Sequence, residues 1–424
     1  MTALTKQLQS FVENTTESPF SIYNLPYGVF YDSNNTTPRI GTAIGDYVLD
    51  LALLEEKGIL TIGHQRLFNH DTLNVFASQG KSVWSSVRRR IQSLLSIDNQ
   101  ELQADQALLS SVLIPQDKIT MKLPFKIEGF SDFYASEQHA SNVGKLFRGK
   151  ENPLLPNWKH LPVAYNGRAS TVYLSGKTIT RPKGQLKPPD VDVPFFAPSK
   201  KLDFEIELGV FVGVGNPDGK RIRIEEAADH LFGLVLLNDW SARDIQAFEY
   251  QPLGPFLSKS FATSISAWVV PLEALQNVMV PLPKQSPACV EYLHQPSRFL
   301  PDIKLKVEIQ PRNSTHKTMI CETNAKELYW SLEQMIAHHT VNHCVMKPGD
   351  LLGTGTISGL NRENWGSLLE ISSNGVNPIT LHDGSNRVFL EDGDTVIITG
   401  YAETPDYKIG FGRVEGMVVS AVQD

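Results

Sequence analysis

Cysteine is scarce in this sequence. Among 424 residues there are only three, Cys289, Cys321 and Cys344, an odd number with long spacings and no CxxC pair. This pattern argues against a disulfide framework and favours a reducing compartment. We therefore expect a cytoplasmic protein.

The chain also lacks the features of membrane and nucleic-acid-binding proteins. Its apolar runs are far shorter than the ~20 residues of a membrane span, and its N-terminal segment shows no apolar core of a secretory signal. Lys and Arg number 39 against 46 Asp and Glu, a net charge of −7, with no basic run. We expect no membrane and no nucleic acid as partner, and an anionic small molecule would need local cations to hold it.

Two parts of the chain differ in pattern. Residues 1–118 combine short strand-like runs at 27–31 and 39–44 with a helical stretch near 83–95. Strand-like runs and Gly, Pro and Asn turns dominate residues 119–424. The sequence therefore predicts a mainly β protein with some helix, in which a small N-terminal β-rich domain supports a large C-terminal one.

The densest group of polar side chains follows an apolar run at 231–237, which is typical of a buried strand. The group comprises Asp239, Arg243, Gln246, Tyr250 and Lys259. A helical turn with a capping-box outline from Ser241 to Asp244 would place Arg243 and Gln246 on one face. Two fixed donors beside an acid and a lysine suit a centre where oxyanion charge develops. The alternative is a capped surface turn with ordinary ion pairs.

Acidic and apolar residues alternate along 203–209. Asp203, Glu205 and Glu207 would share one face of a strand, because residues two apart point to the same side. A hard cation bound by oxygens, Mg²⁺ or Ca²⁺, would relieve their repulsion, and Asp239 could add a further ligand. The alternative is the solvated outer face of an edge strand.

His139 lies where a predicted loop enters a helix, with apolar residues at the following four-residue steps. A lone histidine beside a buried stripe is more often a core residue. Its neighbours in sequence, Asp132, Tyr134 and Arg148, favour a functional role instead. A catalytic histidine needs a carboxylate to fix its tautomer, and Glu370 is a candidate that the residues alone do not select.

Two further motifs have weak support. His339 and His343 are four apart, but the intervening Glu of a zinc protease motif is missing and no third ligand is defined. Residues 353–359 form a GxGxxxG run, which is one residue off the dinucleotide fingerprint. A turn or substrate-cradling loop is the better interpretation there.

Together, five blocks of this sequence resemble the fumarylacetoacetate hydrolase (fumarylacetoacetase) family: DFYASEQHASNVGKLFRG (132–149), 151–170, LDFEIELGVFVG (202–213), NDWSARDIQAFEYQPLGPFLSKSF (238–261) and 355–370. The resemblance implies an N-terminal SH3-like barrel (1–118) and a C-terminal β-roll domain (119–424) that forms a homodimer. It also implies a metal-dependent hydrolase that cleaves the carbon–carbon bond of 4-fumarylacetoacetate to fumarate and acetoacetate, the last step of tyrosine and phenylalanine catabolism.

The same resemblance assigns roles to individual residues. Metal ligands for Mg²⁺ or Ca²⁺ are implied at Asp132, Glu205, Glu207 and Asp239, with Lys259 and Thr263 at positions of a further metal-associated or oxyanion cluster. His139 is implied as general base held by Glu370, and the oxyanion donors as Arg243, Gln246 and Lys259. The substrate-contacting positions are Tyr134, Arg148, Tyr165, Gln246, Tyr250 and Thr356.

Two rivals remain on the sequence alone. One is another enzyme of the superfamily, an acylpyruvate hydrolase, hydratase or decarboxylase; those are usually shorter and resemble only the C-terminal portion. The other is a non-catalytic metal-binding or interaction protein on the same fold.

Overall fold

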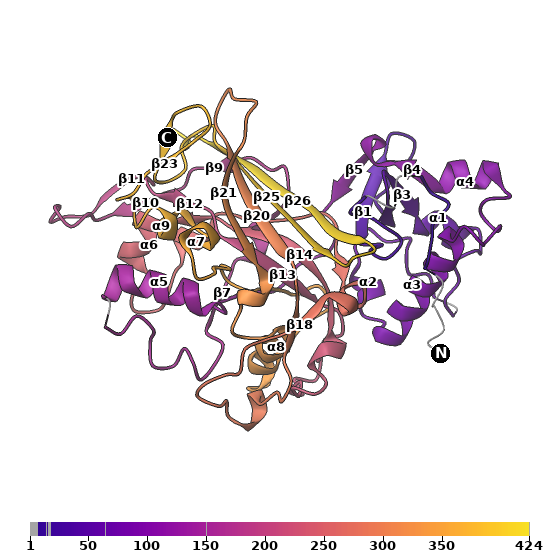
Figure 1. Cartoon of the computed structure of the whole chain (residues 1–424), viewed down its shortest axis with the longest axis horizontal. Helices are drawn as coiled ribbons and strands as arrows, with labels where there is room; N and C mark the ends of the chain where they lie inside the picture. The colour runs from indigo at the N-terminus through magenta and orange to yellow at the C-terminus, as the bar shows by residue number, and fades with distance from the viewer. Residues whose placement is uncertain (1–6, 14, 16–17, 64, 150, 424) are drawn as a thin grey trace.

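The computed structural model describes residues 7–13, 15, 18–63, 65–149 and 151–423, so the first six residues of the segment searched for a secretory signal lie outside it. Figure 1 shows a smaller N-terminal part beside a larger body that holds the rest of the chain. The larger body is built mainly of strands and the N-terminal part combines one sheet with helices, which confirms the prediction of a mainly β protein with some helix. No helix in the described ranges is long and apolar enough to cross a membrane.

The N-terminal part is an antiparallel sheet with helices beside it. Its strand order is β4-β3-β2-β1-β5, which is compatible with the SH3-like detail; that detail stays a prediction. The strands are β1 (Tyr27–Asp32), β2 (Arg39–Ile44), β3 (Tyr47–Asp50), β4 (Leu113–Pro115) and β5 (Ile119–Lys122). The helices are α1 (Leu51–Glu56), α2 (Asn74–Ala77), α3 (Lys81–Leu95) and α4 (Gln106–Val112). The helix expected near 83–95 is therefore confirmed as α3.

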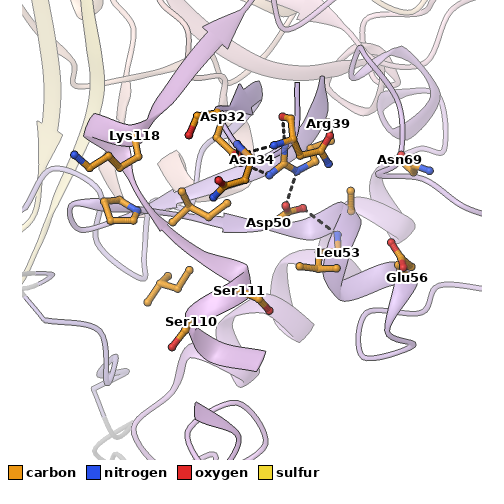
Figure 2. A pocket seen from close by; sticks show the side chains of 16 residues that line it. Asp32, Asn34, Arg39, Asp50, Leu53, Glu56, Asn69, Ser110, Ser111 and Lys118 are labelled. Atoms are coloured by element: carbon orange, nitrogen blue, oxygen red, sulfur yellow. Dashed lines mark hydrogen bonds and ion pairs between the residues drawn. The ribbon is translucent and has the colours of Figure 1, made fainter. Parts of the chain in front are cut away.

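A buried ion-pair network lies in this sheet, beside a hollow of about 540 Å³ (Figure 2). The guanidinium of Arg39 donates to Asp50 and to Asp32, each at 2.5 Å. The second oxygen of Asp50 accepts from the Leu53 backbone at the start of α1. Each buried charge here has an opposite charge, so the network holds strands β1, β2 and β3 together.

The larger body contains two main sheets. The first has the order β7-β6-β22-β13-β14-β16-β8, with β17 also paired to β14. Its strands are β6 (Phe130–Phe133), β7 (Ala164–Asn166), β8 (Val172–Leu174), β13 (Ile206–Val212), β14 (Leu231–Asp239), β16 (Thr263–Ile265), β17 (Val270–Pro271) and β22 (Leu351–Gly353). The second sheet has the order β21-β20-β25-β26-β9. It comprises β9 (Ile179–Thr180), β20 (Lys304–Gln310), β21 (Thr318–Asn324), β25 (Thr395–Glu403) and β26 (Lys408–Val419).

Short strand pairs and helices complete this body. The pairs are β10 (Lys183–Leu186) with β11 (Phe195–Pro198), β12 (Leu202–Asp203) with β15 (Ser241–Ala242), β18 (Met279–Pro281) with β19 (Phe299–Pro301), and β23 (Ile379–Thr380) with β24 (Asn386–Arg387). The helices are α5 (Glu137–Arg148), α6 (Arg243–Glu249), α7 (Leu257–Ser260), α8 (Leu332–Thr340) and α9 (Leu368–Ile371).

Strand β14 joins the two parts. All of its residues are buried, as expected for an uninterrupted apolar run covered on both faces. Leu234 and Leu236 belong to the core of the larger body, whereas Phe232 packs against Tyr27 and Trp84 of the N-terminal part. The two parts therefore share a hydrophobic core.

The domain limits 1–118 and 119–424 remain a prediction. Strand β5 pairs with β1, so the N-terminal sheet continues to Lys122. The observed packing fits the expected supporting role of the N-terminal part, since it covers one face of the sheet that carries the site described below.

Candidate active site

Three buried carboxylates meet on the first sheet of the larger body. Asp132 comes from β6, Glu207 from β13 and Asp239 from the last position of β14, and one oxygen of each lies within 4.8 Å of the others. Strand β22 runs between β6 and β13 and places Gly353 opposite Asp132. A Cβ at Gly353 would lie 2.4 Å from an Asp132 oxygen, so only glycine leaves room for the two carboxylates beside it.

The charges of this cluster are not balanced within it. Burial and then the neighbouring carboxylates raise the pKa of Asp132 and of Glu207 well above the ordinary range. The Gly355 backbone N–H donates to Glu207 Oε2 at 3.0 Å, but Glu207 Oε1 is buried with no hydrogen-bond partner in the described chain. An unpaired carboxylate oxygen in a crowded, all-oxygen donor set fits a hard divalent cation such as Mg²⁺ or Ca²⁺.

Glu205 has a different environment from the one expected of a ligand. Its Oε1 accepts from Arg243 at 2.7 Å and its Oε2 accepts from Lys259, and it lies outside the three-residue group. Burial would raise the pKa of Glu205, but Lys259 and Arg243 outweigh it and hold the pKa below the usual range. In this structure Glu205 is paired with two cations.

The residues around Asp239 complete this side of the site. Lys259, on α7, donates to Asp239 at 2.6 Å, and Thr263 donates to its other oxygen at 3.0 Å. The Tyr165 hydroxyl donates to Asp239 at 2.8 Å and lies 3.2 Å from Asp132. The predicted set of Asp132, Glu205, Glu207, Asp239, Lys259 and Thr263 is thus brought together, with Lys259 as an ammonium donor to carboxylates.

His139 faces this cluster from helix α5. The Ser136 side chain caps the helix by accepting from the His139 backbone N–H, so the histidine sits in the first turn. Its Nδ1 is 2.7 Å from Glu370 Oε2, and its Nε2 is 3.8 Å from Glu205 Oε1. His139 is 3% exposed, so the expectation of a buried histidine is confirmed. Its hydrogen-bond partner, however, is a carboxylate.

Glu370 is held on several sides. Asn142 donates to Oε1 at 2.9 Å, while Ser358 and Ser367 donate to Oε2 at 3.0 and 2.8 Å. Burial would raise the pKa of Glu370, but His139 and these hydrogen bonds lower it. The carboxylate therefore stays ionised and fixes the histidine with Nδ1 protonated and Nε2 free. The sequence did not single out Asn142, Ser358 or Ser367; the only signal was their place in the two blocks that carry His139 and Glu370.

Arg243 and Gln246 share one face of helix α6, as predicted. The guanidinium donates to Gln246 Oε1 at 3.1 Å. The expected capping box is wrong: the helix begins after Ala242, and Ser241 donates instead to the Asp239 backbone oxygen. The Asp244 carboxylate, free of that role, accepts from Ser199 at 2.6 Å.

The alternating acidic strand also differs from its prediction. Asp203, Glu205 and Glu207 are all buried, so the solvated edge face is wrong; nor do they share one strand, because Asp203 ends β12, Glu205 lies between the strands and Glu207 is in β13. Asp203 stands apart from the three-carboxylate group, because its oxygens accept from Arg243 and from backbone N–H groups.

The expected substrate-contacting residues lie at different depths. Tyr134 is half-buried, and its ring lies edge-on to that of His139, at 5.2 Å between centroids. The Thr356 hydroxyl is buried, and no described residue hydrogen-bonds to it. Arg148 and Tyr250 lie farther out: Arg148 is exposed and donates to the Pro153 carbonyl, and the Tyr250 ring is 6.5 Å from that of Phe147.

The two motifs with weak support do not form separate sites. His339 hydrogen-bonds to Ser131 at 2.7 Å, whereas His343 contacts the Gly219 carbonyl at 3.0 Å. They hold different parts of the chain, which argues against a zinc pair. The glycine run at 353–359 supplies the loop whose Gly355 N–H contacts Asp132 and Glu207, so it cradles the acidic cluster.

Known families match nearly the whole chain. The description "Fumarylacetoacetate (FAA) hydrolase C-terminal" matches residues 129–419, and "Fumarylacetoacetase N-terminal" matches residues 23–124. The human protein named fumarylacetoacetase is 49% identical over 415 residues, which cover 97% of this chain and 99% of that protein. The Caenorhabditis elegans fumarylacetoacetase is 49% identical over 418 residues, covering 98% of this chain and all (100%) of that one. The Arabidopsis thaliana fumarylacetoacetase is 46% identical, with 97% and 98% covered.

Solved structures show the same fold at low sequence identity. A putative HpcE protein from Mycobacterium smegmatis has a TM-score of 0.54 at 19% identity, with 93% of this chain and 99% of that chain covered. A fumarylacetoacetate hydrolase from Exiguobacterium antarcticum has a TM-score of 0.53 at 15% identity, with the same coverage of 93% and 99%. The two family descriptions match residues 23–124 and 129–419, and the chain is 49% identical to the human fumarylacetoacetase over 97% of its length. The chain therefore belongs to the fumarylacetoacetase family.

Proposed function

We propose that this chain is a metal-dependent hydrolase that cleaves 4-fumarylacetoacetate to fumarate and acetoacetate, as the last step of tyrosine and phenylalanine breakdown. One observation carries the proposal: the buried His139–Glu370 pair lies beside a cluster of three carboxylates with an unpaired oxygen. A base and a cation site are the two elements that this hydrolysis needs.

The cation is proposed to be Mg²⁺ or Ca²⁺, held by Asp132, Glu207 and Asp239. When bound, such an ion supplies a Lewis acid that polarises a carbonyl oxygen of the diketone. Glu205 is a further proposed ligand on the family pattern, and Lys259 and Thr263 are proposed to orient Asp239 through their hydrogen bonds.

His139 is proposed to be the general base. Because Glu370 accepts from Nδ1, the lone pair of Nε2 points away from it and is free to take a proton from water. The hydroxyl adds to the carbonyl carbon next to the fumaryl double bond. The bond from that carbon to the central methylene then breaks, its electron pair stays on the methylene as an enolate, and a proton completes acetoacetate.

Arg243, Gln246 and Lys259 are proposed to stabilise the oxyanion. Burial lowers the pKa of Arg243 and of Lys259, but the adjacent carboxylates outweigh it and raise both, so each side chain stays protonated as a donor. Removing one such donor typically costs ~3–4 kcal/mol in the transition state. Tyr134, Arg148, Tyr165, Gln246, Tyr250 and Thr356 are proposed to contact the substrate, whose two terminal carboxylates need cations or hydroxyls.

We also propose that the enzyme is a cytoplasmic homodimer. The family pattern supports the dimer, and the free thiols of Cys289, Cys321 and Cys344 fit a reducing compartment. Light scattering of the purified protein measures the oligomeric state directly, and fractionation of the source cells measures the compartment.

A direct assay tests the function. Hydrolysis removes the ultraviolet absorbance of the diketone, and fumarate is identified as a product. Chelation should abolish turnover and added Mg²⁺ or Ca²⁺ should restore it. Turnover of an acylpyruvate with none of the diketone would favour the superfamily rival, and metal binding without turnover of either would favour a non-catalytic protein.

A further inference from the structure

Asp203 is a buried carboxylate to which neither the resemblance nor the proposed mechanism gives a role. Its exposed fraction is 0%, and both of its oxygens are fully used. Oδ1 accepts from the backbone N–H groups of Phe204 at 2.8 Å and Leu368 at 2.7 Å. Oδ2 accepts from the Leu369 N–H at 3.0 Å and from Arg243 Nε at 2.8 Å.

These bonds connect two separate pieces of the proposed machinery. Strand β12, which ends at Asp203, pairs with β15, and the next residue after β15 is Arg243. Leu368 and Leu369 are the first residues of α9, the turn that carries Glu370. Their N–H groups have no acceptor inside such a short turn, so an outside carboxylate satisfies them.

We propose that Asp203 is a positioning residue that fixes the Arg243 guanidinium and the Glu370 turn relative to each other. This inference rests on the proposed function, because it assumes that Arg243 stabilises the oxyanion and that Glu370 orients His139. Asp203 itself touches neither the substrate nor the cation in this account. It acts by holding the donor and the oriented base at a constant separation.

The geometry requires a charged acceptor at this position. Asparagine has nearly the same shape, but its amide nitrogen is a donor and would face either an N–H group or the guanidinium. In either orientation of the amide, Leu368 or Leu369 at the start of α9 loses its acceptor, so Asp203→Asn breaks a bond in the connection to the Glu370 turn. A displacement of about 1 Å at a catalytic group typically costs ~10²-fold in rate.

A matched control is present elsewhere in the chain. Asp394 is also fully buried (0%) and accepts from Arg387 Nε at 2.8 Å, as Asp203 does from Arg243. Its other bonds go to Arg387 and to the Glu391 backbone, and among the described residues neither contacts the candidate site. Asp394→Asn removes a similar buried pair and should lower the unfolding midpoint to a similar extent.

The first test measures kcat, KM and Mg²⁺ affinity for both variants. We expect D203N to lose about 10²-fold in kcat with unchanged Mg²⁺ affinity, and D394N to keep the wild-type kcat. The proposal fails if both variants lose kcat equally, because the loss would then follow from destabilisation. It also fails if D203N loses Mg²⁺ affinity, because Asp203 would then belong to the cation site.

A second readout does not depend on activity. The proton on His139 Nδ1 lies between that nitrogen and Glu370 Oε2, which are 2.7 Å apart, and should give a far-downfield proton NMR signal, assigned by its loss in E370Q. We expect this signal to shift in D203N and to stay in D394N; an unchanged signal in D203N would overturn the proposal. If the wild-type protein leaves the diketone intact, the proposed function is refuted. The NMR comparison of D203N with D394N would still test whether Asp203 positions the Glu370 turn.

A double variant covers the case in which D203N does not fold. D203N/R243Q removes the guanidinium together with the carboxylate, and Glu205, the other partner of Arg243, keeps its ion pair with Lys259. Its imidazole signal is then compared with that of R243Q alone. A shift between the two supports the connection from Asp203 to the Glu370 turn, and coincident signals refute it.

Discussion

Two groups of buried carboxylates in this chain are built differently. In the N-terminal sheet, Asp32 and Asp50 flank Arg39, and each carboxylate also accepts a backbone N–H (Figure 2). In the sheet that carries the candidate site, three carboxylates face one another; among the described residues Lys259 is the only ammonium bound to this group, and Glu207 Oε1 has no partner. Both groups hold more carboxylates than cations, but every oxygen of Asp32 and Asp50 has a donor, whereas the acidic cluster leaves Glu207 Oε1 without one, where a bound cation would supply the missing charge. The comparison separates a structural site from a functional one by hydrogen-bond accounting alone.

The largest effect is expected at the base. His139→Ala should lower kcat by ~10²–10⁴-fold, because proton transfer by a positioned base contributes that much. Mg²⁺ affinity should remain, since the histidine is no part of the acidic group. His339→Ala is the matched control, because the His339 ring hydrogen-bonds to Ser131. Ser131 precedes Asp132 on β6, and adjacent residues of a strand point to opposite faces, so this bond lies on the face away from the acidic cluster. Wild-type turnover by H139A would remove His139 from the base role.

A substitution in the Asp32–Arg39–Asp50 network should lower the free energy of unfolding and leave kcat unchanged. Asp50→Asn removes the charged acceptor of the Arg39 Nε bond while Asp32 still pairs with the guanidinium, and a lost hydrogen bond to a charged group costs about 1.5–3 kcal/mol. Urea unfolding of the protein measures this loss. The kcat of the folded fraction should stay at the wild-type value; a lowered kcat would show that the two groups are not separate in function.

Metal should stabilise the acidic cluster. At 100 times its dissociation constant, a cation that binds only the folded state adds about 2.7 kcal/mol. Thermal unfolding in EDTA and in increasing Mg²⁺ or Ca²⁺ measures the gain. Glu207→Gln should lose it, whereas D50N should keep it in full. An equal midpoint with and without either ion would contradict the cation site.

The smallest expected effect is a gain in stability, whereas most substitutions of a buried residue lower the free energy of unfolding. In EDTA, Glu207→Gln should be slightly more stable than the wild type, because burial and the neighbouring carboxylates raise the pKa of Glu207 and the substitution removes that disfavoured charge. Urea unfolding in EDTA measures the difference. If E207Q is instead less stable in EDTA, the acidic group is balanced by contacts other than a cation.

The sequence predicted the buried strands and the family better than the contacts between distant residues. The buried strand β14 and the α3 helix follow from apolar pattern alone. The pairing of His139 with Glu370 does not, because 231 positions separate them and only the folded sheet brings them together. Family resemblance supplied that pair before the structure did.

The acidic strand shows where pattern reasoning stops. Alternation placed Asp203, Glu205 and Glu207 on one strand with one environment, but the structure divides them between β12, the residue before β13, and β13 itself. In the structure each meets a different partner, namely the Arg243 and α9 donors, the Arg243–Lys259 pair, and the other carboxylates. Those partners come from distant segments, so a local pattern contains no information on which acid meets which.

Strand β14 has a consequence for variants far from the active site. Phe232, near its start, lies in the aromatic packing of the N-terminal part, and Asp239, its last residue, lies in the acidic cluster. The two are about 23 Å apart at ~3.3 Å per residue, on one continuous strand. A substitution that repacks Tyr27 or Trp84 is therefore expected to move a carboxylate it never touches. Inactive variants that map to the first hundred residues need not indicate a second functional site there.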